Sequence, residues 1–296
     1  MEGFMEKILV TGASGFLGSH VADALSKCGK KLVLLDKIPS AFRTGSQKMV
    51  IGDILDRKKL FNVMKGVDCV FHLAAMADIN KTWDNPRETM KVNILGTTNV
   101  LEAARLNGVK RFIFASTLYC DSRSGSLYRV SKQAGELLVK AYHERCGMEY
   151  ILLRFGTLYG TRARDNNSIR KILKEALKGK IEYYGTGKEV REYIHVRDAA
   201  NICTTLLGDK YVGDTLILTG YHRFRLTEIL DMINEILGNK VKVEYFPKDN
   251  RAHYEQVPYS YVPKSLKRVV PETYADMGGS LVEILEEIDE TNDSVR

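Results

Sequence analysis

The sequence predicts an α/β protein with a doubly wound parallel sheet and a smaller C-terminal region. Two observations support this prediction. Short apolar segments alternate with helical segments from the N-terminus to about residue 156, and the character of the chain changes after that point. Such alternation is typical of βαβ units, whose right-handed crossovers put helices on both faces of a parallel sheet. A chain of 296 residues is long enough to bury the core that this fold requires.

The individual elements follow in chain order. Apolar runs predict strands at 7–10, 31–35, 48–51, 69–73, 111–115 and 150–153. Apolar residues at helical spacing predict helices at 16–28, 57–65, 86–106 and 128–145. Beyond Arg154 we expect helices at 168–178, 196–207, 227–237 and 280–288, strands at 215–218 and 242–245, and a glycine-rich turn at 184–187. No long flexible linker separates the two parts, so they are expected to pack around a cleft.

Composition narrows the classes of protein to which the chain can belong. Apolar residues make up 44% and charged residues 27% of the chain, which excludes a disordered or low-complexity protein. No long apolar run predicts a membrane span, and the N-terminus does not resemble a secretory signal. Five widely spaced cysteines lack C-x-x-C spacing, so we expect no metal site and a reducing, cytoplasmic environment. The net charge of +7 fits nucleic acid, a membrane surface or an anionic small substrate.

A glycine-rich loop joins the first predicted strand to the first predicted helix. Its glycines, Gly12, Gly15 and Gly18, have G-x-x-G-x-x-G spacing, which permits a tight turn, close approach of a diphosphate and close packing of the helix on the sheet. Asp36 ends the second strand, where its carboxylate can bind the adenosine ribose diol and would repel a 2′-phosphate. This context predicts a dinucleotide-binding (Rossmann) domain that prefers NAD, although Lys37 and Arg43 leave NADP open. The alternative is a tight turn without a ligand.

A tyrosine and a lysine lie four residues apart on the predicted helix 128–145. This spacing puts the Tyr128 phenol and the Lys132 ammonium on one helix face. A nearby cation is expected to stabilise the phenolate and to lower the tyrosine pKa from about 10, so the phenol can exchange a proton near neutral pH. Considered by itself, the pair would more often be an exposed helical pair.

Together with the glycine loop and Asp36, this pair resembles the short-chain dehydrogenase/reductase superfamily. The chain is more closely similar to the extended branch, the NAD-dependent nucleotide-sugar epimerase/dehydratase family, over about residues 6–240. Further segments that match the family are 52–54, 72–75, 93–104, 114–119, 153–160 and 190–200. The resemblance implies an NAD-binding Rossmann domain at 1–156, to which 193–220 return, and a substrate-binding region at 157–192 and 221–296.

The resemblance also assigns residues to the site. The residues that it places at the cofactor are Gly12, Ser14, Gly15, Phe16, Leu17, Gly18, Asp36, Lys37, Asp53, Ile54, Leu73, Ala74, Ala75, Asn93, Tyr128 and Lys132. Those that it places at the substrate are Thr117, Tyr128, Thr157, Arg191 and Arg251. Arg251 has a second reading as a solvated loop charge.

The chemistry implied by the resemblance is transient oxidation of a sugar. Tyr128 takes a proton from the C4 hydroxyl while hydride passes from C4 to the nicotinamide. Thr117, or Ser116 as a second choice, hydrogen-bonds the reacting oxygen, and Lys132 keeps Tyr128 ionised and binds the nicotinamide ribose. Rotation of the 4-keto sugar and return of the hydride then give the 4-epimer.

Several positions depart from the family pattern. Leu118 and Tyr119 follow Thr117 where dehydratases have an Asp-Glu pair, which disfavours elimination unless Asp121 or another residue substitutes. Thr157 stands where the family usually has Asn. Cys120 replaces a glycine, and the interval from Thr117 to Tyr128 is short for the family. A more open or rearranged sugar site is therefore expected.

The leading hypothesis is an NAD-dependent nucleotide-sugar 4-epimerase. The alternatives are a 4-keto-sugar reductase or dehydratase of the same family, and a non-catalytic dinucleotide sensor. The resemblance implies a homodimer through helices 86–106 and 128–145, although core packing explains the same apolar stripes. Small diphosphates, rather than nucleic acid or membrane, explain the basic charge, and the basic segment 162–180 is expected to border the substrate entrance. His195 is interpreted as structural, whereas Trp83 either lines or covers the sugar pocket.

Overall fold

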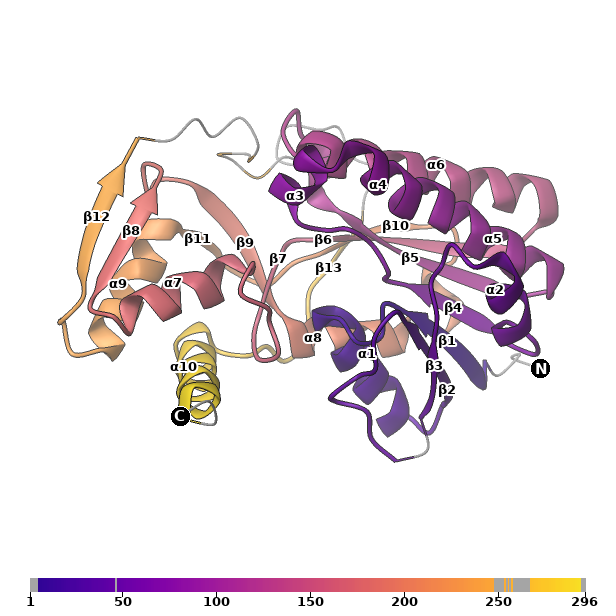
Figure 1. The fold of residues 1–296 in the computed structure, drawn as a ribbon, viewed down its shortest axis with the longest axis horizontal. Coiled ribbons are helices and arrows are strands. Elements are labelled where there is room, and N and C mark those ends of the chain that lie inside the picture. The colour runs from indigo at the N-terminus through magenta and orange to yellow at the C-terminus, as the bar shows by residue number, and fades with distance from the viewer. Residues whose placement is uncertain are drawn as a thin grey trace.

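An eight-stranded, wholly parallel sheet forms the larger lobe of the computed structural model (Figure 1), which describes residues 5–45, 47–247, 253, 255, 257 and 267–293. The strand order is β13-β10-β6-β5-β4-β1-β2-β3. The strands are β1 (Lys7–Thr11), β2 (Lys31–Asp36), β3 (Lys48–Ile51), β4 (Cys69–His72), β5 (Arg111–Thr117), β6 (Glu149–Phe155), β10 (Thr215–Leu218) and β13 (Lys267–Val269). This topology confirms the predicted doubly wound parallel sheet.

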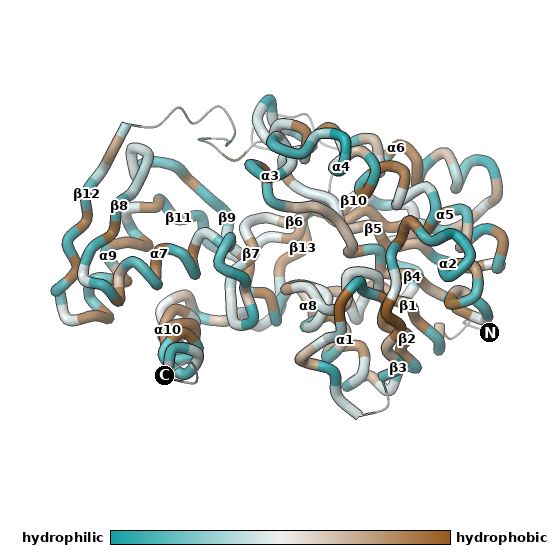
Figure 2. The backbone as a smooth tube through the Cα atoms, in the orientation of Figure 1, coloured by the Kyte–Doolittle hydropathy of each residue, from teal (hydrophilic) through white to brown (hydrophobic). Residues whose placement is uncertain are grey.

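Helices cover both faces of the sheet (Figure 1). They are α1 (Phe16–Lys27), α2 (Arg57–Val63), α3 (Ile79–Asp84), α4 (Pro86–Met90), α5 (Thr97–Leu106), α6 (Ser126–Cys146) and α8 (Val196–Thr205). Alternation along the strands divides the core into two clusters: Ile8 and Val10 pack toward α1 and α8, whereas Leu9 packs toward α2, α5 and α6. Burial on both faces explains why the strands are continuously apolar, and in Figure 2 β1, β4 and β5 are coloured as hydrophobic along most of their length.

A smaller lobe holds a third apolar cluster. Its strands are β7 (Thr157–Tyr159), β8 (Lys180–Tyr184), β9 (Val190–His195), β11 (Arg223–Arg225) and β12 (Lys242–Phe246), and its helices are α7 (Ser168–Ala176), α9 (Leu226–Ile236) and α10 (Met277–Asp293). The strands form a three-stranded sheet, β11-β9-β7, and a two-stranded sheet, β12-β8. In Figure 1 this lobe lies beside the carboxyl ends of β5 and β6.

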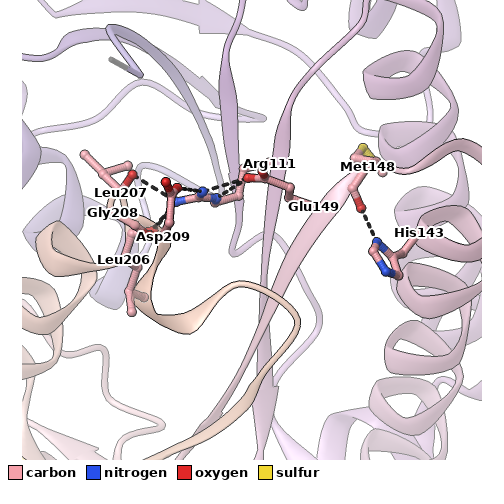
Figure 3. Close-up of polar contacts among 8 residues, drawn as sticks. All are labelled: Arg111, His143, Met148, Glu149, Leu206, Leu207, Gly208 and Asp209. Atoms are coloured by element: carbon pink, nitrogen blue, oxygen red, sulfur yellow. Dashed lines mark hydrogen bonds and ion pairs between the residues drawn. The ribbon is translucent and has the colours of Figure 1, made fainter. Parts of the chain in front are cut away.

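A buried arginine in the large sheet binds the segment that follows α8. Arg111 opens β5 and is 1% exposed. Its Nη1 donates to the carbonyl oxygens of Leu206, Leu207 and Gly208, which follow α8, and its Nη2 pairs with Glu149 and Asp209 at 2.7 and 2.6 Å (Figure 3). One side chain therefore provides hydrogen-bond donors to carbonyl groups just beyond the carboxyl end of α8. The last carbonyl groups of a helix have no N–H donor from a following turn of that helix.

Several predicted elements need correction. The predicted helix 86–106 is confirmed as a continuous helical segment, but its middle, Lys91–Gly96, is a π-helical turn between α4 and α5. The strands β7, β8, β9, β11 and β13, the helix α3, and short 3₁₀ turns at Leu118–Asp121 and Asp209–Tyr211 were not predicted. Most of these strands have three to six residues, and their half-polar sequences lack a run of apolar residues. The last helix begins at Met277 and ends at Asp293, outside both predicted bounds.

Candidate functional site

A cavity of about 920 Å³ lies between the two lobes. Its walls come from the β1–α1 loop, the segment after β4, the end of β5, α6, β7, α7 and β8. The carboxyl ends of parallel strands are where α/β folds bind nucleotides, and this volume is in the range of sites for small ligands. Of the predicted site residues, the cavity brings together Gly12, Gly15, Phe16, Leu17, Gly18, Leu73, Ala75, Ser116, Thr117, Tyr128, Lys132, Thr157 and Arg191.

The β1–α1 loop requires glycine at two of its positions for steric reasons. Gly12 has φ +71°, and a Cβ there would lie 2.7 Å from the Ala74 nitrogen. A Cβ on Gly18 would lie 2.1 Å from the Gly12 oxygen. The Gly15 N–H donates to that same oxygen at 3.0 Å. The turn therefore closes tightly, and the amino end of α1 opens onto the cavity.

Asp36 lies beside this loop at the carboxyl end of β2. Its Oδ2 accepts a hydrogen bond from the Ser14 N–H at 2.9 Å, and the Ser14 hydroxyl donates to the Ile38 carbonyl at 2.8 Å. The Asp36 side chain remains partly exposed. Its carboxylate is therefore held next to the glycine-rich loop. Ser14 acts through its backbone and fixes the loop to the strand.

The remaining residues predicted near the adenosine are engaged with one another or with the core. Lys37 Nζ lies 3.2 Å from Asp53 Oδ2, and Asp53 Oδ1 accepts the Leu55 N–H at 2.9 Å. Lys37 thus has an acidic partner. Ile54 is 6% exposed and packs under Gly96. None of Lys37, Asp53 and Ile54 is on the cavity wall.

The segment after β4 forms another edge of the cavity. Leu73 and Ala75 line it, whereas Ala74 backs Gly12. Asn93, from the π-helical turn, is 2% exposed and is not on the wall. Its side chain bonds the Met76 N–H at 2.8 Å, the Met76 carbonyl at 2.9 Å and the Ser131 hydroxyl at 3.0 Å. Asn93 therefore positions this segment relative to α6.

Thr117, Tyr128 and Lys132 line one wall. The Thr117 side chain lies close enough to the Tyr128 phenol to lower its pKa, and Lys132 Nζ lies 5.9 Å from the centroid of the Tyr128 ring. Lys132 Nζ also donates to the Ala115 carbonyl at 2.7 Å. Burial lowers the pKa of Lys132 to about 8.

The expectation that Lys132 lowers the pKa of Tyr128 is wrong for the protein by itself. Burial raises the pKa of the phenol, the Cys120 thiol adds to that effect, and the Thr117 side chain opposes it. The loss of hydration of a phenolate outweighs the charge of an ammonium whose hydrogen bond is directed to a carbonyl. Tyr128 is therefore protonated at neutral pH before ligands arrive.

The Ser116 hydroxyl belongs to a buried hydrogen-bond network and is not directed to Tyr128. Its hydroxyl donates to Glu136 Oε1 at 2.5 Å, and the same carboxylate binds Arg154 through Nε at 2.8 Å and Nη2 at 2.6 Å. Arg154 Nη1 also pairs with Asp121 at 2.7 Å. Thr117 is therefore the hydroxyl that stays near Tyr128. Asp121, considered as a substitute acid, is held by Arg154 and is not on the cavity wall.

The short segment between Thr117 and Tyr128 is tied down rather than open. Residues Leu118–Asp121 form a 3₁₀ turn whose Cys120 carbonyl accepts from Gln133 Nε2 at 2.8 Å. The Ser122 carbonyl accepts from Arg129 Nη1 at 2.6 Å. These contacts, with the Arg154–Asp121 pair, hold the short segment in place next to the cavity wall.

Sequence reasoning missed several residues on the cavity wall. The Tyr119 hydroxyl lies 2.8 Å from His253 Nδ1, and both residues line the cavity. Tyr119 stands two positions after Thr117, so its place could have been noticed, whereas nothing in the sequence signals His253. The other wall residues not predicted individually include Asp78, Arg164, Lys171 and Glu189. Arg251 lies outside the described residues.

Other residues considered from the sequence have structural or surface positions. His195 is 2% exposed, caps α8 by accepting the Arg197 N–H, and has its pKa lowered to about 4, mainly by burial. Trp83 is 67% exposed and is not on the cavity wall. Within the described ranges, no group of three His, Cys, Asp or Glu side chains could hold a metal ion. Each helix in the described parts of the chain is too short or too polar to cross a membrane.

Comparison with known proteins finds relatives that are named as enzymes of nucleotide sugars. The family model for the NAD dependent epimerase/dehydratase family matches residues 8–216. The chain is 30% identical over 270 residues to the Uncharacterized UDP-glucose epimerase YtcB of Bacillus subtilis (strain 168), covering 82% of this chain and 85% of that protein. It is 28% identical over 283 residues to a UDP-N-acetyl-alpha-D-glucosaminuronate decarboxylase of Bacillus cytotoxicus, covering 86% and 88%. The solved structure of MoeE5 in complex with UDP-glucose and NAD is similar, with 25% identity, a TM-score of 0.82 and coverage of 96% and 99%.

Proposed function

The chain belongs to the NAD dependent epimerase/dehydratase family, and we propose that it interconverts nucleotide-diphosphate sugars that differ at C4, through a transient 4-keto sugar. The observation that carries this proposal is that Thr117, Tyr128 and Lys132 line the same cavity as the amino end of α1. Relatives named as epimerase and decarboxylase leave the reaction to be argued from the site. The proposed nucleotide is uridine diphosphate, after the names of those relatives.

The residues present fit NAD. Gly12 and Gly18 leave room that any Cβ would fill, next to the amino end of α1, so a diphosphate can approach backbone N–H groups closely. The Asp36 carboxylate is held beside the loop and suits an unphosphorylated ribose. Asp53, Leu73 and Ala75 are proposed to border the cofactor, with Ile54, Ala74 and Asn93 supporting it from behind. When bound, NAD supplies a hydride acceptor and donor at the sugar carbon.

The chain's own residues then bind and move a proton. Tyr128 takes the proton of the C4 hydroxyl and returns it, while Thr117 hydrogen-bonds the same oxygen and keeps it oriented. Lys132 contributes a positive charge 5.9 Å from the Tyr128 ring, which favours phenolate against the opposing effect of burial. Arg191 and Thr157, on the facing wall, are proposed to hold the diphosphate and the sugar.

Elimination and decarboxylation are less well supported. The residues after Thr117 are Leu118 and Tyr119, and the first acid beyond them, Asp121, is paired with Arg154. A carboxylate held in that way is not available to remove a proton beside a ketone. A reductase remains the second candidate, since it needs the same three residues. A dinucleotide sensor would have no need of the buried Lys132.

Each lobe is proposed to bind one of the two ligands. Residues 1–156 and 193–220 are proposed to bind the cofactor, and 157–192 with 221–296 to bind the sugar nucleotide. The five cysteines form no disulfide, which supports the proposal of a reducing, cytoplasmic location.

A homodimer is proposed through α5, the π-helical turn and α6. Exposed apolar side chains on these neighbouring elements are Leu95 at 51%, Val130 at 41% and Leu137 at 68% exposure. Such a cluster is typical of an interface. The variant Leu137→Glu should reduce the light-scattering mass from two chains to one, whereas Leu177→Glu, on the smaller lobe, should leave it unchanged. A wild-type mass of one chain would contradict the dimer.

The test of the reaction is a panel of UDP-sugars with products resolved by NMR. Turnover without added NAD, giving a C4 epimer, is the expected result. Tyr128→Phe should lower the rate by about 10²–10⁴-fold, because a positioned general base contributes that much. Tyr142→Phe on the same helix, whose hydroxyl bonds Glu102, should be unaffected. Stoichiometric consumption of NADPH would instead show a reductase.

A further inference from the structure

The loop from β7 to α7, residues 160–167, crosses between the two lobes. Arg162 Nη1 pairs with Asp23 Oδ2 of α1 at 2.8 Å, and its guanidinium lies 4.5 Å from the centroid of the Phe42 ring. The His20 ring, also on α1, lies 3.1 Å from the Thr161 carbonyl through Nε2. The first half of the loop is therefore seated on the helix whose amino end forms the phosphate site.

The second half of the loop is fixed from two other directions. Asn167 caps α7 by accepting the Ile169 and Arg170 N–H groups, and its Nδ2 donates to the Leu158 carbonyl at 2.9 Å. Asn166 Nδ2 donates to Asp78 Oδ2 at 3.4 Å, on the segment before α3. The loop thus spans the cavity from α1 to the segment after β4.

Arg164 stands between these two attachments, on the cavity wall. Its side chain is exposed and makes no hydrogen bond or ion pair with any residue in the described part of the chain. The adjacent acid does not neutralise it, because Asp165 pairs with Lys174 at 2.5 Å and with Arg170 at 3.5 Å. A guanidinium is thus presented to the cavity by a loop that is anchored at both ends.

The cavity that Arg164 lines has features of a diphosphate-binding site. The same cavity is lined by Gly15, Phe16 and Leu17, at the amino end of α1, where the helix dipole favours anions. Both NAD and a nucleotide sugar carry a diphosphate. An arginine can bind such a group through two parallel hydrogen bonds, which a lysine cannot reproduce.

We propose that Arg164 is a diphosphate-binding residue, contributed by the smaller lobe to the cavity that the amino end of α1 also lines. This inference deepens the proposed function and rests on it for the identity of the two diphosphate ligands. Because its loop is tied to α1 by Arg162, the arginine needs little rearrangement to bind. A ligand held between α1 and Arg164 contacts both lobes at once.

The test measures binding rather than turnover, with Arg164→Gln, Arg164→Lys and the control Arg145→Gln. Arg145 is exposed at the end of α6, away from the cavity, and its replacement removes the same charge. One arm measures the dissociation constant of NADH for protein stripped of cofactor, by fluorescence. The other arm measures UDP binding to the NAD-loaded protein by calorimetry.

Arg164→Gln should weaken one of the two ligands by about tenfold, within the range of hydrogen bonds to charged groups. Arg164→Lys should restore part of the loss, and Arg145→Gln should change nothing. The ligand whose binding is weakened, NADH or UDP, identifies the diphosphate that Arg164 contacts. Unchanged binding in both arms, or an equal loss in Arg145→Gln, overturns the inference. Neither arm requires turnover. A loss of ligand binding in Arg164→Gln can therefore be detected even if the protein has no epimerase activity. Conversely, epimerase activity can be found even if Arg164 contributes nothing to binding.

Discussion

The buried Glu136–Arg154 pair offers a sharp test of how the end of β5 is held next to α6. Glu136 is 5% exposed and accepts hydrogen bonds from Ser116 at 2.5 Å and from two nitrogens of Arg154 at 2.8 and 2.6 Å. Burial opposes the charge on Arg154, but the Glu136 carboxylate outweighs burial and holds the pKa of the guanidinium above its usual value. Glu136 lies four residues after Lys132 on α6, so this network links β5, β6 and α6.

The variant Glu136→Gln keeps the volume and removes the charge. Removing one partner of a buried ion pair costs about 3–5 kcal/mol, because the other charge stays buried. Arg154 keeps Asp121 at 2.7 Å, so we expect the lower end, about 3 kcal/mol of the free energy of unfolding. Urea denaturation at one fixed NAD concentration measures this loss through the midpoint and slope of the transition.

Glu102 provides a matched control. It binds Arg105 through the same two nitrogens, at 3.0 and 2.6 Å, but on the solvent side of α5. Glu102→Gln should shift the urea midpoint very little, because water screens an exposed pair. Equal small shifts for Glu102→Gln and Glu136→Gln would refute the reasoning, since burial would then add nothing to the pair.

Three other predictions follow from the same structure. Gly18→Ala places a Cβ 2.1 Å from the Gly12 oxygen, so NADH fluorescence titration should show more than tenfold weaker binding, whereas Gly208→Ala, with 3.8 Å of clearance, should bind normally. Burial lowers the pKa of Lys132 from 10.5 to about 8, so the unfolded chain binds more protons between these values. The unfolding free energy of wild type minus that of Lys132→Met should therefore rise by about 2–3 kcal/mol from about pH 7 to pH 10, and a flat difference would contradict it. Arg111→Leu leaves three carbonyl groups without their donor and should cost about 3 kcal/mol or more in urea denaturation, with little loss counting against the assigned role.

The parallel sheet and the tight glycine-rich turn after β1 could be predicted because their signals are local. Strands buried on both faces are continuously apolar, and the spacing of Gly12, Gly15 and Gly18 has a direct steric reason in the turn. The strands β7 and β9 carry no comparable signal. They are short, and β9 carries the charged residues Arg191 and Glu192; the ion-pair partner of Glu192, Arg223, comes from a distant segment.

The site was predicted less completely because its polar partners are far apart in sequence. The choice between Ser116 and Thr117 depends on Glu136, which reaches Ser116 from α6. The sign of the Tyr128 pKa shift depends on how much protein surrounds the phenol, which spacing along a helix does not report. The approach of His253 to Tyr119 spans 134 residues of sequence, and no local pattern predicts it.

The large sheet is completed by strands from opposite parts of the chain. Leu216 in β10 pairs with Leu153 in β6 on one side and with Lys267 in β13 on the other. The polypeptide therefore leaves the sheet three times, after β6, β10 and β13, to build the smaller lobe, and neither lobe is a contiguous stretch of sequence. Such contacts between distant segments have a high contact order, which slows folding. Neither lobe can be excised, transplanted or exchanged with a relative as one piece, so changes in the smaller lobe must arise by substitution and loop insertion within a shared frame.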